Sequence, residues 1–343
     1  MNTEPLLVTM GDPVGIGPET IAKAHRAGAL ADTVVVGDAG VLRRALAVTG
    51  GAVPVAVLDE PADRIRVPPG ALALWQPPGL PPGLSGLPWG RVDARAGAAA
   101  AACIVAATRQ VLAGRARALV TAPIHKEALS AAGVSYPGHT ELLQAEASAH
   151  AGRALPVRMM LANDELRVVL VTIHVSLRRA IEALDQPGIL ETLRITDAAL
   201  RRFGLVAPRI GVAGLNPHAG EGGLFGDEEI RLIAPAVEAA RAEGIDARGP
   251  FAPDTVFMRA RDAAGHPGEF DAVVAMTHDH GLIPVKYLGV EQGVNVTLGL
   301  PLVRTSPDHG TAFDIAGRGV ADPSSLLAAM KMARRLSAAG HGD

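Results

Sequence analysis

Seven Val-rich apolar runs recur along the chain, separated by longer stretches whose apolar residues follow a helical pattern. The runs are apolar at consecutive positions, so a strand formed from one would be buried on both faces. Helices that cover both faces of a mostly parallel sheet provide this burial, so the alternation predicts an α/β fold. We expect strands at residues 6–10, 33–37, 116–122, 167–173, 209–215, 271–277 and 293–300.

The stretches between the runs predict at least five helices. Asp322 and Pro323 are typical of an N-cap and a first helical residue, so they predict the start of the last helix. Residues 75–90 are rich in Pro and Gly and are expected to be irregular, either as a linker or as a surface excursion. The helices are expected at 18–28, 93–113, 187–203, 227–243 and 323–338.

The composition restricts the possible partners. A length of 343 residues indicates two lobes or one large α/β domain. The net charge is −3 and aromatic residues make up only 3%, which argues against nucleic-acid binding. The single cysteine, Cys103, excludes an internal disulfide and is expected to be buried. The N-terminal segment lacks the pattern of a signal peptide, and no apolar stretch is long enough to span a membrane, so we expect a cytoplasmic protein.

Histidines follow three of the expected strands at their carboxyl ends. His174 follows the strand at 167–173, His218 the strand at 209–215, and His278 the strand at 271–277. Ligands of parallel sheets bind at this edge. Three imidazoles at equivalent strand ends therefore predict a site for a divalent metal ion. The alternative for each histidine is a structural or surface role.

Two glycine-rich segments could approach a ligand. GDPVGIGPE, 11–19, connects a strand to a helix but lacks the GxGxxG spacing, so a Rossmann site is not supported. This turn either packs closely within the protein or approaches a ligand. HGTAFDIAGRG, 309–319, would present backbone donors to an anion if a helix followed it.

A sparse polar set is suited to a carboxylate or phosphate. Lys286, Asn295 and Arg304 lie near expected strand ends, with solvent exposure as the alternative for each. PGHTELL, 137–143, reads as a turn that leads into a helix. We expect His139 or Thr140 to cap that helix or to contact a phosphate at its N-terminus.

Seven motifs, taken together and in order, resemble the 4-hydroxythreonine-4-phosphate dehydrogenase family of vitamin B6 biosynthesis. The first and last motifs are also similar to segments of isocitrate and isopropylmalate dehydrogenases. The resemblance implies a two-lobed fold of that kind, with a mostly parallel sheet and a non-Rossmann cofactor site. It implies a cofactor-side lobe of residues 1–130 and 296–343, and a metal, substrate and dimerisation lobe of 131–295. The motifs are GDPVGIGPE, TAPIHKEAL, PGHTELL, GLNPHAGEGGLFGDEE, HDHGLIPVKYLG, GVNVTLGLP and RTSPDHGTAFDIAGRGVADP.

The resemblance also implies roles for individual residues. One divalent ion per subunit, Zn, Mg or Co, would be bound by His174, His218 and His278. The substrate would be bound by His139, Thr140, Lys286, Asn295 and Arg304. NAD or NADP would lie near Gly11, Gly15, His309, Gly310 and Asp314. The family is homodimeric with its active site at the interface, so some ligands would come from the partner subunit.

The implied reaction is metal-dependent, NAD(P)-linked oxidation and decarboxylation of 4-phosphooxy-L-threonine to 3-amino-2-oxopropyl phosphate, in pyridoxal phosphate biosynthesis. Lys286 and Asp279 are the candidate general bases, although Asp279 could instead orient His278. The sequence departs from the family at TIHVSL, around His174, and at HDHG, where His280 replaces the usual glutamine; we expect His280 to be a surface residue.

Three other functions remain open. A sister dehydrogenase would oxidise 4-phosphoerythronate, 4-phosphothreonate or an aromatic dihydrodiol on the same scaffold. A metal-dependent hydrolase would use the three histidines without a nucleotide, against which the 309–319 loop argues. A non-catalytic solute-binding protein would bind its ligand without turnover.

Overall fold

The computed structural model describes residues 4–51 and 53–338, which form two compact units. Unit 1 runs to Pro156 and resumes over Leu300–Ala338, and unit 2 comprises Val157–Gly299. The chain therefore leaves unit 1 after Pro156, forms unit 2 and returns to unit 1 at Leu300. It stays a prediction that the lobe of residues 1–130 and 296–343 binds the cofactor. It also stays a prediction that the lobe of residues 131–295 binds the metal ion and forms the dimer contact.

Unit 1 is built on a parallel sheet with β1 near its centre. The strand order is β3-β4-β2-β1-β5-β12, and every described pairing among these strands is parallel. The chain builds outward from β1 through β2 and then returns to β5 on its other side. Ligands of open α/β sheets bind at such a reversal, beyond the carboxyl ends of the strands. The strands are β1 (Leu6–Thr9), β2 (Thr33–Val36), β3 (Val55–Leu58), β4 (Leu72–Trp75), β5 (Ala118–Thr121) and β12 (Arg304–Pro307).

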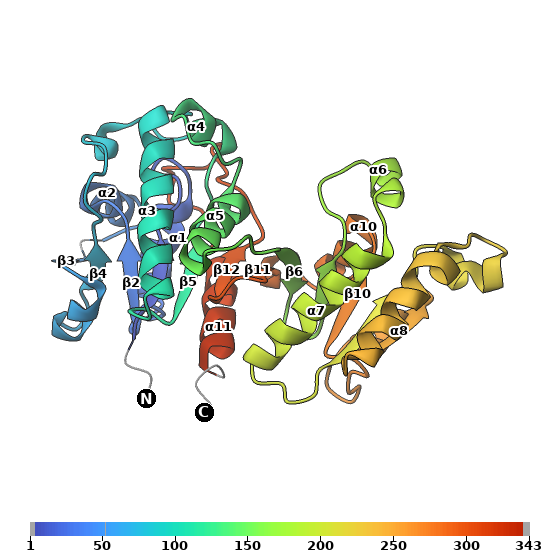
Figure 1. Cartoon of the computed structure of the whole chain (residues 1–343). Coiled ribbons are helices and arrows are strands. Elements are labelled where there is room, and N and C mark those ends of the chain that lie inside the picture. The colour runs from blue at the N-terminus through green and yellow to red at the C-terminus, as the bar shows by residue number, and fades with distance from the viewer. Residues whose placement is uncertain (1–3, 52, 339–343) are drawn as a thin grey trace. The chain divides into compact units, whose positions relative to one another are not determined.

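Helices cover both faces of this sheet because its central strands are apolar at all but one position each and are buried. The strands β1, β2 and β5 are buried at every position. One group of helices contacts α3, and a second group contacts α1 (Figure 1). The first group is α3 (Ala94–Leu112), α4 (Lys126–Ala131) and α5 (His139–Ala151), and the second is α1 (Gly17–Arg26), α2 (Ala39–Val48) and α11 (Ser324–Ala338).

Unit 2 contains a mixed sheet in the order β11-β6-β7-β10-β8-β9. β6 pairs antiparallel with both β11 and β7, whereas β7, β10, β8 and β9 run parallel. The parallel part aligns the carboxyl ends of β7, β10 and β8 at one edge. The strands are β6 (Arg158–Ala162), β7 (Arg167–Leu170), β8 (Arg209–Ala213), β9 (Asp246–Phe251), β10 (Ala272–Ala275) and β11 (Val294–Leu298).

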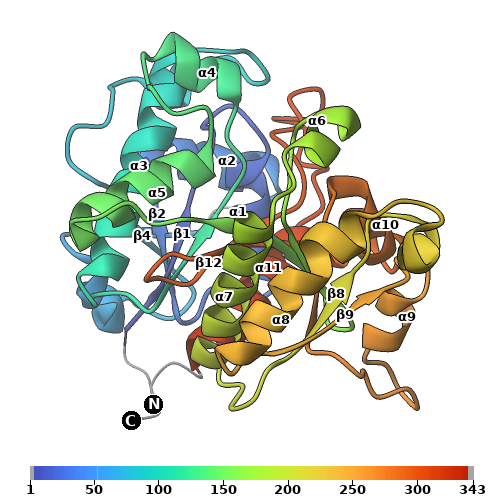
Figure 2. The same ribbon diagram turned by 45° about the vertical axis from the view of Figure 1, so that its right-hand side comes forward.

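Two pairs of helices cover the sheet of unit 2. α7 and α8 contact one another and lie side by side in Figure 2. α9 and α10 contact β8, β7 and β10 and enclose a core that includes Phe257, Phe270 and Leu282. The helices of this unit are α6 (Leu177–Glu182), α7 (Gln186–Arg202), α8 (Ala234–Ala242), α9 (Val256–Ala260) and α10 (His278–Tyr287).

All seven expected strands and all five expected helices are present, and the α/β fold with a mostly parallel sheet is confirmed. Residues 75–90 lie within unit 1, so they are a surface excursion and not a linker between the units. Cys103 is buried, and burial raises the pKa of its thiol, as expected for a packing residue. Within residues 4–51 and 53–338, no helix is both long and apolar enough to cross a membrane.

Candidate active site

The glycine turn after β1 packs directly against the end of β5. Gly11 has a φ of +73°, and a Cβ there would lie 2.4 Å from the carbonyl oxygen of Pro123. The amide of Asp12 donates to the same oxygen at 2.9 Å. Gly15 approaches Thr311 in the same way, with a Cβ position 3.1 Å from it. The close approach of this turn is therefore to the protein itself, and a cofactor contact at Gly11 or Gly15 stays a prediction.

The end of β5 also receives two predicted substrate-binding residues. Arg304, at the start of β12, donates to the Thr121 hydroxyl from Nε at 3.1 Å and from Nη2 at 2.6 Å. His139, at the start of α5, shares a hydrogen bond of 3.2 Å with the carbonyl oxygen of Ala122 through Nε2. A carbonyl only accepts, so His139 carries its hydrogen on Nε2. Three distant segments thus meet at Thr121–Pro123.

The charges at this edge favour an anionic ligand. Arg304 is 3% exposed, and burial lowers the pKa of its guanidinium from 12.5 to about 10, so the group remains cationic at neutral pH. Burial and the charge of Arg304 hold the pKa of His139 well below 6.5, so His139 is neutral. A buried guanidinium beside a neutral histidine is stabilised by a phosphate or carboxylate, which a guanidinium can bind through two parallel hydrogen bonds.

The N-terminus of α5 differs from expectation. The N-cap is Gly138, whose φ of −171° is extended, and no side chain caps the helix. The prediction that Thr140 is the cap is therefore wrong, because Thr140 lies inside the first turn. The first amides of a helix attract anions, and this 13-residue helix has no side-chain cap to occupy them.

The 309–319 loop is also built differently from the prediction. No helix follows it directly, since α11 begins at Ser324 after an Asp322 carboxylate that accepts the Ser324 amide at 2.9 Å. His309 Nδ1 lies 2.9 Å from the carbonyl oxygen of Gly310, and Asp314 is exposed. The expectation that a following helix presents donors to an anion is therefore wrong. Cofactor contacts by His309, Gly310 and Asp314 stay a prediction.

In unit 2, the three predicted metal ligands follow three adjacent parallel strands. His174 follows β7, His278 follows β10 and His218 follows β8, and β10 pairs with both of the other strands. The rings of His174 and His278 lie 5.7 Å apart between centroids. His174 and His218 adopt φ values of 48° and 52°, in the left-handed region that non-glycine residues rarely occupy. Such strain persists where the surrounding structure imposes it, and it is common at functional sites.

A buried carboxylate holds the loop that carries His218. Glu229 is 3% exposed, and its Oε1 accepts the amides of Leu215 and Asn216, both at 2.7 Å. Its Oε2 accepts Asn216 Nδ2 at 2.9 Å. This arrangement stabilises a run of left-handed residues from His218 to Gly222.

The histidines fit a metal ion in chemistry and, for two of them, in distance. With metal–nitrogen distances near 2 Å, two imidazoles on one ion place their ring centroids about 5 to 6 Å apart. The separation of 5.7 Å between His174 and His278 agrees with this geometry. Within the described part of one chain, however, no three such side chains lie close enough to share an ion. His218 is instead close to Glu221, 3.1 Å from its Nδ1.

The remaining predicted residues also lie in unit 2. Asp279 is 81% exposed, and its Oδ1 lies 2.8 Å from Nδ1 of His278, the contact expected if Asp279 orients this histidine. Lys286 lies in the last turn of α10, and Asn295 is half-buried in β11 opposite Leu161 of β6. The predicted substrate set is therefore divided between unit 1 and unit 2.

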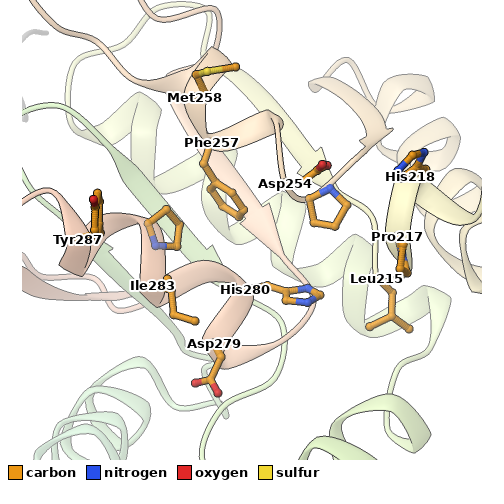
Figure 3. A pocket seen from close by; sticks show the side chains of 12 residues that line it. Leu215, Pro217, His218, Asp254, Phe257, Met258, Asp279, His280, Ile283 and Tyr287 are labelled. Carbon is orange, nitrogen blue, oxygen red and sulfur yellow. The ribbon is translucent and has the colours of Figure 1, made fainter.

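A cavity of about 700 Å³ lies beside α10, entirely within unit 2. In Figure 3 the His280 ring points into the cavity, between Phe257 and Leu215, whereas the Asp279 carboxylate points away from Phe257. His280 is half-buried, and its buried Nδ1 has no partner among the described residues. The expectation of a surface histidine is therefore wrong. The apolar lining side chains are Leu215, Pro217, Pro253, Phe257, Met258, Ile283, Pro284 and Tyr287.

Three buried residues that hold loops or side chains in the two units were missed from the sequence. Thr121 falls within an expected strand, and Glu19 and Glu229 fall within expected helices, where no role was assigned to them. Both glutamates stand in motifs quoted above, GDPVGIGPE and GLNPHAGEGGLFGDEE. Their place at the ends of glycine-rich segments was the available sign that they bind backbone amides.

Comparison with known proteins identifies the family. The model of the family described as pyridoxal phosphate biosynthetic protein PdxA matches residues 29–333. The chain belongs to the PdxA family. Among its relatives, a 4-hydroxythreonine-4-phosphate dehydrogenase from Beijerinckia indica subsp. indica is 55% identical over 342 residues, which cover 98% of this chain and 96% of that protein.

Two further members of the PdxA family are informative. A D-threonate 4-phosphate dehydrogenase from Pectobacterium atrosepticum is 46% identical over 340 residues, covering 97% of this chain and 99% of that protein. The crystal structure of 4-hydroxythreonine-4-phosphate dehydrogenase from Klebsiella pneumoniae matches with a TM-score of 0.88 and 46% identity, over 97% of this chain and 98% of that one. These relatives are dehydrogenases, which implies a nicotinamide cofactor for the family.

Proposed function

We propose that this protein oxidises and decarboxylates 4-phosphooxy-L-threonine to 3-amino-2-oxopropyl phosphate, using NAD or NADP, in pyridoxal phosphate biosynthesis. The observation that carries the proposal is the buried Arg304 guanidinium beside neutral His139 at the end of β5, in a chain of the PdxA family. A phosphorylated hydroxy acid is an anion suited to this edge. The 55% identity to a relative named 4-hydroxythreonine-4-phosphate dehydrogenase supports the same substrate.

The reaction removes a hydride from the carbon that bears the secondary hydroxyl, and the hydroxyl proton leaves. The resulting 3-keto acid then loses its carboxylate as CO2, and a proton adds to the carbon that carried it. NAD or NADP, when bound, accepts the hydride. In this proposal Lys286 or Asp279 removes the hydroxyl proton, and Asp279 alternatively orients His278.

In this proposal five residues bind and orient the substrate. They are Arg304, His139, Thr140, Lys286 and Asn295. The guanidinium pairs with the phosphate or carboxylate, and the start of α5 adds backbone donors without a second charge. Neutral His139 gives its Nε2 hydrogen to Ala122, so its Nδ1 accepts a hydrogen from a hydroxyl or amino group of the substrate. Fixing both ends of a short substrate holds its reacting carbon in one position, which lowers the entropic part of the barrier.

We further propose that His174, His218 and His278 bind one divalent ion, Zn, Mg or Co, in a homodimer whose active site lies at the interface. A divalent ion, when bound, polarises the substrate oxygen. Ligands shared between two subunits would account for the absence of a three-donor group within the described part of one chain. The exposed apolar side chains Met258, Ile283 and Tyr287, around the cavity of unit 2, are suited to a subunit contact. A location in the cytoplasm stays a prediction.

A second candidate reaction is oxidation of D-threonate 4-phosphate. It is favoured by the D-threonate 4-phosphate dehydrogenase from Pectobacterium atrosepticum, which is 46% identical over nearly the whole chain. The two substrates share a phosphate, a carboxylate and a secondary hydroxyl, and they differ in carrying an amino group or a hydroxyl group at the adjacent carbon. The anion site at Arg304 does not distinguish the two substrates, because it would bind a phosphate or a carboxylate and both substrates carry these groups.

The deciding experiment measures formation of reduced nicotinamide with each substrate in turn. Each assay is run as purified, after treatment with a chelator, and after a divalent ion is restored. Turnover of 4-phosphooxy-L-threonine that is lost with chelator and regained with metal would support the proposal. Turnover of D-threonate 4-phosphate alone would support the second candidate, and turnover of neither, with NADH and NADPH both unbound, would contradict both.

A further inference from the structure

Helix α1 directs two polar side chains, one turn apart, at the end of the 309–319 loop. Glu19 is fully buried, its Oε2 accepts the amide of Gly319 at 2.9 Å, and its Oε1 accepts the amide of Gly317. Lys23 Nζ donates to the carbonyl oxygen of Ala321 at 2.6 Å. Residues four apart share a helix face, so one face of α1 satisfies both amides and a carbonyl of this segment.

The same segment packs too closely for side chains. A Cβ on Gly317 would lie 2.5 Å from the ring of Trp89, and one on Gly319 would lie 2.3 Å from the carbonyl oxygen of Val48. Both glycines are in the left-handed region, with φ values of +81° and +67°. The other end of the loop is held where the amide of Ile16 donates to the carbonyl oxygen of Thr311 at 3.0 Å.

This packing separates an inner side of the loop from an outer side. The amides of Gly317 and Gly319 donate to a carboxylate, so they are occupied, and the negative charge of Glu19 would repel a phosphate placed there. Gly310, Asp314 and Arg318 are exposed. A nucleotide bound at this loop therefore meets the exposed residues and not the glycine amides.

We infer that Glu19 is a positioning residue for the nicotinamide nucleotide. It touches no part of the ligand and acts by holding the 309–319 loop in one conformation before the nucleotide arrives. A loop that is ordered in advance loses less conformational entropy on binding, which raises affinity. The inference rests on the proposed function, since it takes this loop as part of the nucleotide site.

The test compares Glu19→Gln with Glu229→Gln in the full chain. Glutamine keeps the size of the side chain, but its NH2 group faces a backbone N–H and cannot accept it. For Glu19→Gln we expect the dissociation constant of NADH or NADPH, measured by calorimetry, to rise about tenfold. The KM of the cofactor rises with it while kcat is unchanged. Glu229→Gln makes the same substitution at a buried carboxylate that accepts backbone amides in unit 2, and it leaves the NADH affinity unchanged.

Hydrogen exchange distinguishes positioning from general destabilisation. In Glu19→Gln the amides of Gly317 and Gly319 exchange faster, the β1 and β5 amides keep their protection, and saturating NADH restores the protection of the loop. Faster exchange at Gly317 and Gly319 with wild-type NADH affinity would overturn the inference. A wild-type protein that binds neither NADH nor NADPH would instead contradict the proposed function itself.

A second variant covers the case in which Glu19→Gln does not fold. Lys23→Met keeps the half-buried stem of the side chain and removes the hydrogen bond to Ala321 together with the positive charge near Asp322. We expect the dissociation constant of NADH to rise about threefold, because one hydrogen bond of the loop is lost while two remain. An unchanged dissociation constant in Lys23→Met would then overturn the inference.

Discussion

The imidazole rings of His174 and His278 lie 5.7 Å apart between centroids, although they follow different strands of unit 2. The reason is the parallel register of β7 and β10, which pairs Leu170 with Ala275 and so aligns the ends of the two strands. Each histidine follows its strand after a short connection. Register of a buried sheet is strongly specified, so the proximity of these rings follows from the core of unit 2.

Removal of either histidine should reduce metal binding. We expect His174→Ala and His278→Ala to lose about tenfold or more in affinity for Zn²⁺, because each removes one proposed ligand. Affinity is measured by competition with a chromophoric chelator. His150→Ala, on the exposed end of α5, is the control and should bind Zn²⁺ as the wild type does. Unchanged affinity in both test variants would exclude the proposed site.

Replacement of Arg304 should weaken substrate binding even when its charge is kept. Arg304→Lys loses the planar fork that contacts the Thr121 hydroxyl from both Nε and Nη2. We expect kcat/KM for the phosphorylated substrate to fall about 100-fold, because lysine cannot form the two parallel hydrogen bonds of a guanidinium. Steady-state kinetics test this, with the exposed Arg115→Lys as control. Wild-type kcat/KM in Arg304→Lys would remove Arg304 from the substrate site.

Gly11 and Gly28 have the same φ, so substituting each one distinguishes the cost of backbone strain from the cost of steric overlap. Gly11 and Gly28 both have a φ of +73°, but a Cβ would meet Pro123 O at 2.4 Å at Gly11 and nothing within 4 Å at Gly28. We expect Gly28→Ala to lower the free energy of unfolding by about 1 kcal/mol. Gly11→Ala should lower it by about 3 kcal/mol or more, since overpacking adds to the strain. Urea unfolding of both variants measures the difference, and equal losses would contradict the close packing of the glycine turn.

An ion cluster in unit 1 should make stability depend on pH in acid. Burial raises the pKa of Asp32, but hydrogen bonds and charge from Arg334 and the charge of Arg117 outweigh it and lower the pKa from 3.8 to about 2. The carboxylate therefore stabilises the fold above pH 4, and this contribution is lost as the pH falls from about 4 to 2.

Asp32→Asn removes this contribution. With about a third of the side chain exposed, we expect a loss of about 1 to 2 kcal/mol at pH 7 and almost none near pH 2. Urea midpoints at several pH values measure it, with exposed Asp59→Asn as the control. A loss in Asp32→Asn that is the same at both pH values would show that charge is not the cause.

A charge on the apolar rim of the unit 2 cavity should disrupt the proposed homodimer. Ile283 is 64% exposed on α10, and we expect Ile283→Glu to weaken dimerisation about 100-fold or more, because it would place an unpaired charge in the contact. Sedimentation velocity measures the change. Val206→Glu, at a position 90% exposed in the same unit, is the control and should sediment as the wild type does. Unchanged sedimentation of Ile283→Glu would locate the contact elsewhere.

Strands buried on both faces could be predicted from local sequence alone. The run AVVA in β10 is apolar at every position, and LLVT in β1 is apolar up to its last residue, Thr9. Both strands are buried throughout, and burial under helices satisfies such a pattern. β4 (LALW) has this property and was nevertheless missed, whereas other missed elements lack it. β12 is RTSP and β9 is DARGPF, with Gly and Pro in the run, while α10 contains Gly281 and Pro284. Their backbone hydrogen bonds are made with neighbours that are distant in sequence.

The sequence by itself determined the α/β class, seven of the strands and the family, and it predicted the residues that follow each of those strands. Tertiary structure alone decided that Glu19 and Glu229 are buried and bind loop amides. It also decided that Arg304, His139 and Gly11 meet at Thr121–Pro123, and that His280 lines a cavity. Hydrophobic periodicity reports which face of one element is buried, whereas the partner of a polar side chain depends on which strands become neighbours.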